Sequence, residues 1–270
     1  MKKALLTIAA LTLAVISTFA FTACGPKVTF VANALESAEI EEYGLCVGKN
    51  ATKKAEILEA MNDVILNKDI DAAVTYYTAI ASDETPTNTI EVADLSSCTG
   101  GTLNVYTNSG FEPYEFVDDN GDVIGVDIWL MGWVCKELNM KMNVIDVDFN
   151  TIVGKVQNED NAVGAAGITI DDDRKQSVDF SIPYYSSVQY IVSAEEKAYT
   201  KLEQLEGLTI GVQSGTTGAL LIQDAIAAGL DVELKEYKSG AVAFAAAKAG
   251  KCDVVVIDAL PAMKMVKTQK

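Results

Sequence analysis

The chain has 270 residues, a length that suits one large or two small domains around a sizeable core. It carries 21 Lys and Arg residues against 38 Asp and Glu residues, a formal net charge of −17 at pH 7. This charge repels nucleic acid, so no nucleic-acid partner is expected. Histidine is absent, which removes the commonest general base, the Ser-His and Cys-His nucleophile pairs and imidazole metal sites. The composition therefore disfavours enzymes and metal sites, and we expect no cofactor.

The N-terminus has the pattern of a secretory signal peptide. Lys2 and Lys3 precede an almost wholly apolar run over residues 4–21, which ends in small residues before Cys24. We predict that residues 1–23 are the signal peptide. Cys24 after small residues resembles the lipobox of bacterial lipoproteins, although Phe21 replaces the usual Leu. This resemblance implies lipidation at Cys24, with residues 24–26 forming an anchored N-terminus on the extracytoplasmic face of the cell membrane. The alternative is an uncleaved membrane anchor, because the run is nearly long enough to span.

The next segments read as short strands and helices. Short strands are expected at residues 28–31 and 43–47, and amphipathic helices at residues 55–66 and 70–80. A polar stretch rich in Thr and Ser, residues 81–101, has the composition of a linker.

From residue 102 onward, strand-like and helix-like segments alternate. Helices are predicted at residues 126–138, 152–157, 216–228 and 241–249, and strands at residues 103–107, 142–147, 162–170, 188–192, 208–212, 232–237 and 253–257. Such alternation is typical of mostly parallel sheets covered by helices. There are more strand–helix units than one compact sheet needs, so we predict an α/β protein with two lobes.

Four cysteines follow Cys24. Their even number in an exported chain permits disulfides. Cys46 and Cys252 lie in or begin apolar strand-like runs, however, and Cys135 lies on a helical pattern. We therefore predict that these cysteines, with Cys98, are buried free thiols. The chain has no CxxC pair and no metal-ligand spacing.

Four local motifs occur in one order over the second half of the chain. They are residues 107–116 (TNSGFEPYEF) with 125–128 (GVDI), 167–174 (GITIDDDR) with 178–181 (VDFS), 211–218 (GVQSGTTG), and 254–258 (VVVID). Together they resemble the polar amino-acid-binding proteins of bacterial ABC importers. The resemblance implies a type II periplasmic-binding-protein-like fold, in which each lobe is a mostly parallel sheet flanked by helices and a two-strand hinge joins the lobes. It also implies a monomer that captures a polar amino acid by hinge closure and delivers it to an ABC permease.

The N-terminal part resembles the usual C-terminus of that family. Residues 41–47 (EEYGLCV) look like the family's returning hinge segment, and residues 54–62 look like the helix after it. We therefore hypothesise a circular permutation in which residues 81–101 join the original ends. Lobe 1 would then comprise residues 39–80 and 102–188, and lobe 2 residues 27–38 and 189–270. The alternative is an unrelated N-terminal helical segment that precedes a truncated binding protein.

A zwitterionic ligand needs a cation for its carboxylate and an anion for its ammonium group. Arg174 is the candidate cation: its planar guanidinium can bind both carboxylate oxygens, and the resemblance implies that this arginine contacts the ligand. The alternative is a surface arginine after an acidic turn. Asp258 follows an apolar run and should emerge at the carboxyl edge of a parallel sheet, where ligands of such sheets bind. The resemblance makes Asp258 the ammonium partner. The alternative is an N-cap for the next helix.

Except for Phe149, which lies in residues 147–149 (VDF), the remaining candidate ligand-binding residues come from the same motifs. The segment around Gln213, Thr216 and Thr217 leads into a helix whose free N–H groups attract a carboxylate, although Thr216 or Thr217 could be a plain N-cap. Asn108 stands where the family often has Asp, and a neutral amide argues mildly against a cationic ligand side chain. The resemblance further implies that Gly167 and Thr169 contact the ligand through a backbone carbonyl and a hydroxyl; the alternative is that both are plain turn residues. It also implies that Phe111 and Phe149 form an aromatic sandwich around the ligand; the alternative is that both pack in the core.

Two other functions compete with this prediction. One is a dehydratase-like enzyme on the same scaffold that uses an acidic residue, such as one of Asp171, Asp172 and Asp173, as acid or base. The other is the ligand-sensing domain of a receptor, which would need a membrane span after residue 24.

Overall fold

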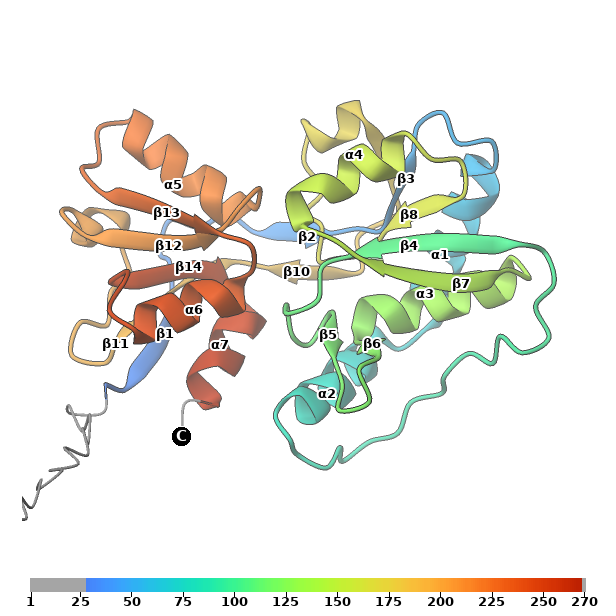
Figure 1. Ribbon diagram of the computed structural model, residues 1–270, viewed down its shortest axis with the longest axis horizontal. Coiled ribbons are helices and arrows are strands. Elements are labelled where there is room, and N and C mark those ends of the chain that lie inside the picture. The colour runs from blue at the N-terminus through green and yellow to red at the C-terminus, as the bar shows by residue number, and fades with distance from the viewer. Residues whose placement is uncertain (1–27, 269–270) are drawn as a thin grey trace, which may run out of the picture.

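The computed structural model describes residues 28–268, so the predicted signal peptide and Cys24 lie outside the described residues. It consists of two lobes, each built on a five-stranded sheet, and a narrow two-stranded crossing between them (Figure 1). The predicted α/β two-lobe fold is therefore confirmed. Within residues 28–268, no helix is long and apolar enough to cross a membrane.

Lobe 1 contains the sheet with strand order β7-β4-β8-β3-β9. β7 (Lys141–Asp146), β4 (Thr102–Thr107) and β8 (Ala162–Gly164) are parallel, whereas β3 (Cys46–Gly48) runs antiparallel to β8 and β9 (Val178–Phe180). Helix α4 (Ile152–Gln157) covers one face of the sheet. Helix α3 (Val126–Glu137) covers the other, and α1 (Lys54–Asn67) and α2 (Ile70–Ala81) pack against it.

Helix α1 forms because its apolar residues recur at helical spacing. Its buried residues are Ile57, Ala60, Met61, Val64 and Ile65. This spacing places them along one side of the helix, which packs into the core of lobe 1. The opposite side carries the charged residues.

Lobe 2 contains the sheet with strand order β1-β11-β14-β12-β13. β12 (Thr209–Gln213) is parallel to β13 (Glu233–Tyr237) and to β14 (Val254–Asp258). β11 (Gln189–Ala194) is antiparallel to β14 and to β1 (Phe30–Ala34). Every residue of β14 is buried, as expected for a central strand covered by helices on both faces. Helix α5 (Thr217–Ala227) covers one face, and α6 (Gly240–Lys248) and α7 (Ala259–Lys267) cover the other (Figure 1).

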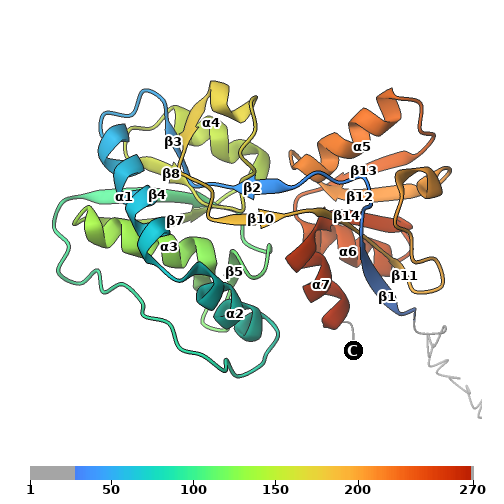
Figure 2. The same ribbon diagram turned by 180° about the vertical axis from the view of Figure 1, so that it is seen from behind.

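Two antiparallel strands connect the lobes. β2 (Glu41–Tyr43) pairs with β10 (Tyr185–Ser187), and Figure 2 shows this pair between the two sheets. Each strand enters lobe 1 at one end and lobe 2 at the other, and β2 falls within residues 41–47, the segment that the resemblance identifies as part of the hinge.

Residues before the polar linker are integral to both lobes. β1 lies in the lobe 2 sheet, β2 in the crossing, and β3 between β8 and β9 in lobe 1. Residues 82–101 contain no helix or strand and run along lobe 1. They are held there by Trp129, whose indole N–H donates to the Glu91 carbonyl at 2.6 Å, and by Lys136, which donates to the Asp94 carbonyl at 2.8 Å.

The structure differs from the predicted elements mainly at turns. The strand predicted over residues 162–170 ends at Gly164, because the chain turns at Gly167, where φ is +54°. The motif at 107–116 leads into a small hairpin of β5 (Phe116–Val117) and β6 (Val123–Ile124) that was not predicted. Short 3₁₀ helices occur at Phe149–Thr151, Arg174–Gln176 and Leu202–Leu205. The four cysteines among the described residues are buried and free, as predicted.

Candidate ligand-binding site

A small cavity lies where the two lobes meet beside the hinge. Eight of the ten predicted ligand-binding residues line it. Lobe 1 contributes Phe111, Phe149, Gly167 and Thr169, and lobe 2 contributes Gln213, Thr216, Thr217 and Asp258. Glu115 and Ala166 complete the lining. Segments separated by more than 100 residues in the chain thus meet at one place.

Asp258 ends β14 and is buried, with only 6% of its surface exposed. It occupies the N-cap position of α7, yet its side chain makes no capping hydrogen bond. Instead, the Tyr43 hydroxyl donates to Oδ1 of Asp258. Burial raises the pKa of Asp258 to about 7, the negative charge of Glu41 adds to this, and the Tyr43 hydrogen bond opposes it. The N-cap alternative therefore does not describe the contacts of Asp258, whose carboxyl group lines the cavity.

Glu115 is a second buried acid in this cavity, and sequence reasoning missed it. Its side chain is 1% exposed, and its Oε2 atom has no hydrogen-bond partner among the described residues. Burial raises the pKa of Glu115 well above its ordinary value, with a further contribution from the negative charge of Asp127. The signal in the sequence was a charged residue inside the apolar run 113–117. Such a buried carboxyl is costly without a partner.

Two aromatic side chains form walls of the cavity. Phe111 is 8% exposed, and its ring stacks on that of Tyr114 with centroids 5.5 Å apart. Gly167 faces this ring, since a Cβ atom there would lie 2.5 Å from Cε1 of Phe111. Phe149 is half-buried and begins the 3₁₀ helix before α4. The rings thus belong both to the lobe 1 core and to the cavity.

The amides of Asn108 and Gln213 pair across the two lobes. Gln213 Nε2 donates to Asn108 Oδ1 at 2.8 Å, and Asn108 Nδ2 donates to the Val147 carbonyl at 2.7 Å. Gln213 Oε1 also accepts from the Gly240 N–H at 3.3 Å. Asn108 does not line the cavity, and its amide is engaged at the contact between the lobes.

The three predicted threonines have different partners. Thr216 is the N-cap of α5, and its hydroxyl accepts from the Ala219 N–H at 3.2 Å, so the N-cap alternative describes its contact. The hydroxyls of Thr169 and Thr217 both donate to Glu41, at 2.9 and 2.6 Å. Glu41, on the hinge, is the second acid that sequence reasoning missed; only the motif at 41–47 drew attention to its segment.

Arg174 lies outside this cavity. Together with Phe149 and Gly215 it lines a neighbouring one. Its guanidinium donates to the carbonyls of Thr169 at 2.8 Å and Gly215 at 3.2 Å, and its Nε lies 3.2 Å from Oδ2 of Asp171. The side chain is only 12% exposed, so Arg174 is not a free surface arginine.

Phe149 lines both cavities and has the Arg174 guanidinium 5.5 Å from its ring centroid. The structure therefore places Arg174 and Asp258 in adjacent cavities that share one aromatic wall. It does not bring them into a single cavity.

Comparisons with known proteins identify a matching family and several similar proteins. Residues 103–209 match the model of the bacterial extracellular solute-binding proteins, family 3. The putative ABC transporter arginine-binding protein 2 of Escherichia coli K12 is 30% identical over 130 residues, which is 48% of this chain and 53% of that protein. The chain thus spans about half the length of the curated relatives it matches.

Two solved structures are also similar. An ancestral arginine-binding protein bound to arginine has a TM-score of 0.59 and 36% identity, over 63% of this chain and 75% of that one. The ancestral amino acid-binding protein AncCDT-1, a precursor of cyclohexadienyl dehydratase, has a TM-score of 0.55 and 30% identity, over 58% of this chain and 70% of that one. The chain belongs to the bacterial extracellular solute-binding proteins, family 3.

Proposed function

We propose that the protein is an extracytoplasmic substrate-binding protein that captures a small polar amino acid between its lobes and delivers it to an ABC transporter. The cavity beside the hinge carries this proposal, because both lobes contribute to it and it combines aromatic walls with buried acids. The relatives named for arginine binding and ABC transport support the same function.

The charge of the cavity favours a cationic ligand group. Its lining includes the buried acids Asp258 and Glu115 and contains no lysine or arginine. Two carboxyl groups in one buried site are stabilised by a cation that contacts both. We propose that Asp258 binds the α-ammonium group and that Glu115 faces the polar end of the ligand side chain. The neutral amide of Asn108 argued mildly against a cationic ligand side chain. The buried carboxyl group of Glu115 is the stronger observation, and it favours such a side chain.

Arg174 remains the proposed partner of the ligand carboxylate. It is a half-buried cation next to the shared wall, Phe149, and its guanidinium contacts backbone carbonyls of both lobes, at Thr169 and Gly215. A carboxylate arriving at that wall would meet a planar donor already held by Asp171.

Hinge closure is the proposed mechanism. The described form already has contacts between the lobes, such as the hydrogen bond from Gln213 to Asn108 at 2.8 Å. A ligand that contacts both lobes binds the closed form better than the open one and therefore shifts the population toward closure. The transporter would recognise the closed form.

The domain organisation that fits this function is the circular permutation. We propose that residues 81–101 join the original ends, with lobe 1 formed by residues 39–80 and 102–188 and lobe 2 by residues 27–38 and 189–270. β1 lies in the lobe 2 sheet and β3 in the lobe 1 sheet. These positions support a permutation rather than an unrelated N-terminal helical segment. We also propose that Cys24 is lipidated and tethers the protein to the outer side of the membrane.

A thermal-shift screen against the twenty amino acids, followed by calorimetric titration of the best ligands, tests the function. A ligand that binds only the folded state stabilises it by about 2.7 kcal/mol at a hundred times its Kd, and this stabilisation raises the melting temperature. We expect basic or other polar amino acids to give the largest shifts. The absence of a shift with every amino acid would contradict the proposal.

An enzyme on the same scaffold is the second candidate function. The buried Glu115 carboxyl favours it, because an acid with a raised pKa can donate a proton to a leaving group. Mass spectrometry of the ligand recovered after long incubation separates the two functions. A binding protein returns the ligand unchanged, whereas a dehydratase returns a product lighter by one water.

A further inference from the structure

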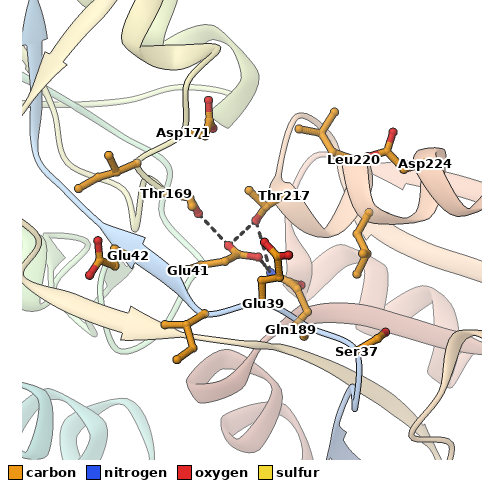
Figure 3. A pocket seen from close by; sticks show the side chains of 14 residues that line it. Ser37, Glu39, Glu41, Glu42, Thr169, Asp171, Gln189, Thr217, Leu220 and Asp224 are labelled. Atoms are coloured by element: carbon orange, nitrogen blue, oxygen red, sulfur yellow. Dashed lines mark hydrogen bonds between the residues drawn. The ribbon is translucent and has the colours of Figure 1, made fainter.

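Glu41 is the first residue of the hinge strand β2, and its carboxylate accepts hydrogen bonds from three side chains (Figure 3). Oε2 accepts from the Thr169 hydroxyl at 2.9 Å and from the Thr217 hydroxyl at 2.6 Å. Oε1 accepts from the Gln189 amide at 3.0 Å. Hydrogen bonds to an ionised acceptor are stronger than neutral ones, so this arrangement is a strong local restraint.

The donors come from both lobes. Thr169 follows β8 in lobe 1, whereas Thr217 begins α5 and Gln189 begins β11 in lobe 2. A single carboxylate on the hinge therefore connects the two lobes only when they are close together. Opening the lobes must break at least the bond from Thr169 or the bond from Thr217.

The same hydrogen bonds orient the two hydroxyl groups. A threonine hydroxyl has one hydrogen to donate, and Thr169 and Thr217 both give theirs to Glu41. Both residues also line the cavity that contains Asp258 and Glu115. With their hydrogens directed to Glu41, these hydroxyls can offer a ligand only oxygen lone pairs, which accept from a cation and repel a carboxylate.

We propose that Glu41 is a positioning residue that holds the lobes closed through Thr169 and Thr217 and makes their hydroxyls acceptors for the cationic group of the ligand. The second half of this inference rests on the proposed amino-acid binding. The first half, the connection between the lobes, concerns the ligand-free protein. Glu41 acts through the threonines, since it does not itself line the small cavity.

Variants at Glu41 and its neighbour test the proposal. Glu41→Ala removes all three hydrogen bonds. Glu41→Gln keeps an acceptor for both threonines once the Gln189 amide rotates, but it removes the charge. Glu42→Ala is the matched control, because Glu42 is an exposed acid on the same strand whose side chain makes no hydrogen bond found among the described residues. Thermal melting checks that each variant is folded.

Small-angle X-ray scattering of the ligand-free proteins measures the connection between the lobes. We expect a larger radius of gyration for Glu41→Ala than for the wild type and for Glu42→Ala, with Glu41→Gln between them. A Glu41→Ala protein as compact as the wild type would overturn the proposal, whether or not any amino acid binds. If the wild type binds no amino acid, the proposed function fails while this measurement still decides the role of Glu41 in closure.

Calorimetric titration with L-arginine and with L-glutamine measures the effect on the ligand. Glu41→Ala should bind the better of these two at least roughly tenfold more weakly than the wild type, because its binding-competent closed form is less populated. Glu41→Gln should recover part of that loss. Unchanged binding by Glu41→Ala overturns the proposal, and tighter binding does so too, since it would mean that Glu41 competes with the ligand for the threonines.

The pH profile provides a readout that a purely structural role would not change. The charge of Glu41 contributes to the raised pKa of Asp258. Glu41→Gln should therefore move the acidic limb of the affinity profile to lower pH, whereas Glu42→Ala should leave it in place. An acidic limb that stays in place in Glu41→Gln would contradict the proposed coupling through the cavity.

Discussion

The hydroxyl of Tyr43, on hinge strand β2, donates a hydrogen bond to the carboxylate of Asp258 at the end of β14. Tyr43 is fully buried, so this bond replaces water as the partner of one Asp258 oxygen. A residue of the hinge thus contacts the residue that we propose binds the ligand ammonium group. The hinge and the cavity are connected directly.

Removing that hydroxyl should weaken ligand binding in a pH-dependent way. The Tyr43 hydrogen bond lowers the pKa of Asp258, which burial otherwise raises. Tyr43→Phe should therefore raise this pKa further and leave Asp258 protonated at neutral pH. We expect affinity to fall roughly ten- to a hundredfold at pH 7 and to recover partly at pH 8.5. Titration calorimetry at both values measures this, and an equal loss at both would contradict the role given to Asp258 ionisation.

Arg174→Ala tests the proposed carboxylate partner. Loss of one partner of a buried charge pair costs roughly 2–5 kcal/mol, so amino-acid binding should become undetectable. Arg174→Lys is the matched variant, since it keeps the charge but cannot donate to the Thr169 and Gly215 carbonyls with one planar group. Micromolar binding by Arg174→Ala would show that Arg174 only holds the lobes together.

Gly167 should not tolerate a side chain. Its φ of +54° favours glycine, and a Cβ atom would meet the Phe111 ring at 2.5 Å. We expect Gly167→Ala to lose roughly 1–3 kcal/mol of unfolding free energy and to weaken ligand binding by displacing that wall. Gly154→Ala is the control, because nothing lies within 4 Å of a Cβ there and the residue is helical. Equal chemical denaturation midpoints for the two variants would contradict this prediction.

Asp127 should make the stability of the protein depend on pH. It is buried at the start of α3, and it accepts from the Gly167 N–H at 2.8 Å and from the Tyr184 hydroxyl at 2.7 Å. Burial raises its pKa to about 7, whereas an unfolded aspartate has a pKa of about 3.9. The folded protein therefore binds a proton that the unfolded chain has released. The associated stability is present below about pH 4 and is lost as pH rises through about 7.

Asp127→Asn has no proton to lose, so its melting temperature should fall less than that of the wild type between pH 5 and pH 8. The difference in unfolding free energy over the full range is on the order of 4 kcal/mol at most. Asp119→Asn, at an exposed position, is the control. Parallel curves for the wild type and Asp127→Asn would contradict the pKa direction.

The linker should tolerate cleavage. Residues 82–101 contain no helix or strand, while the segment before them contributes strands to both sheets. A protease site inserted after Thr87 should therefore give two fragments that stay together in size-exclusion chromatography and still bind the ligand. Fragments that separate without denaturant would contradict the proposal that residues 81–101 only join original ends.

Much of the fold followed from the sequence. Alternating apolar runs and helical patterns predicted most strands and helices of both lobes, because burial of one face repeats with the period of each element. The run at 254–257 marked a central strand with Asp258 at its carboxyl end, and the structure places it there. The turn at Gly167 was missed, because an apolar run does not reveal where the backbone reverses.

The site was only partly determined by the sequence. The four motifs supplied seven cavity residues, since each motif carries its own turn and strand end, and Phe149 came from the family resemblance outside them. Tertiary structure alone decided that Glu115 is buried and that Phe149 lines the cavities of both Arg174 and Asp258. It also decided that Glu41 accepts hydrogen bonds from Thr169 and Thr217, which lie 128 and 176 positions further along the chain. These features depend on which distant segments pack together, and the burial and partners of a charged side chain are set by that packing rather than by its neighbours along the chain.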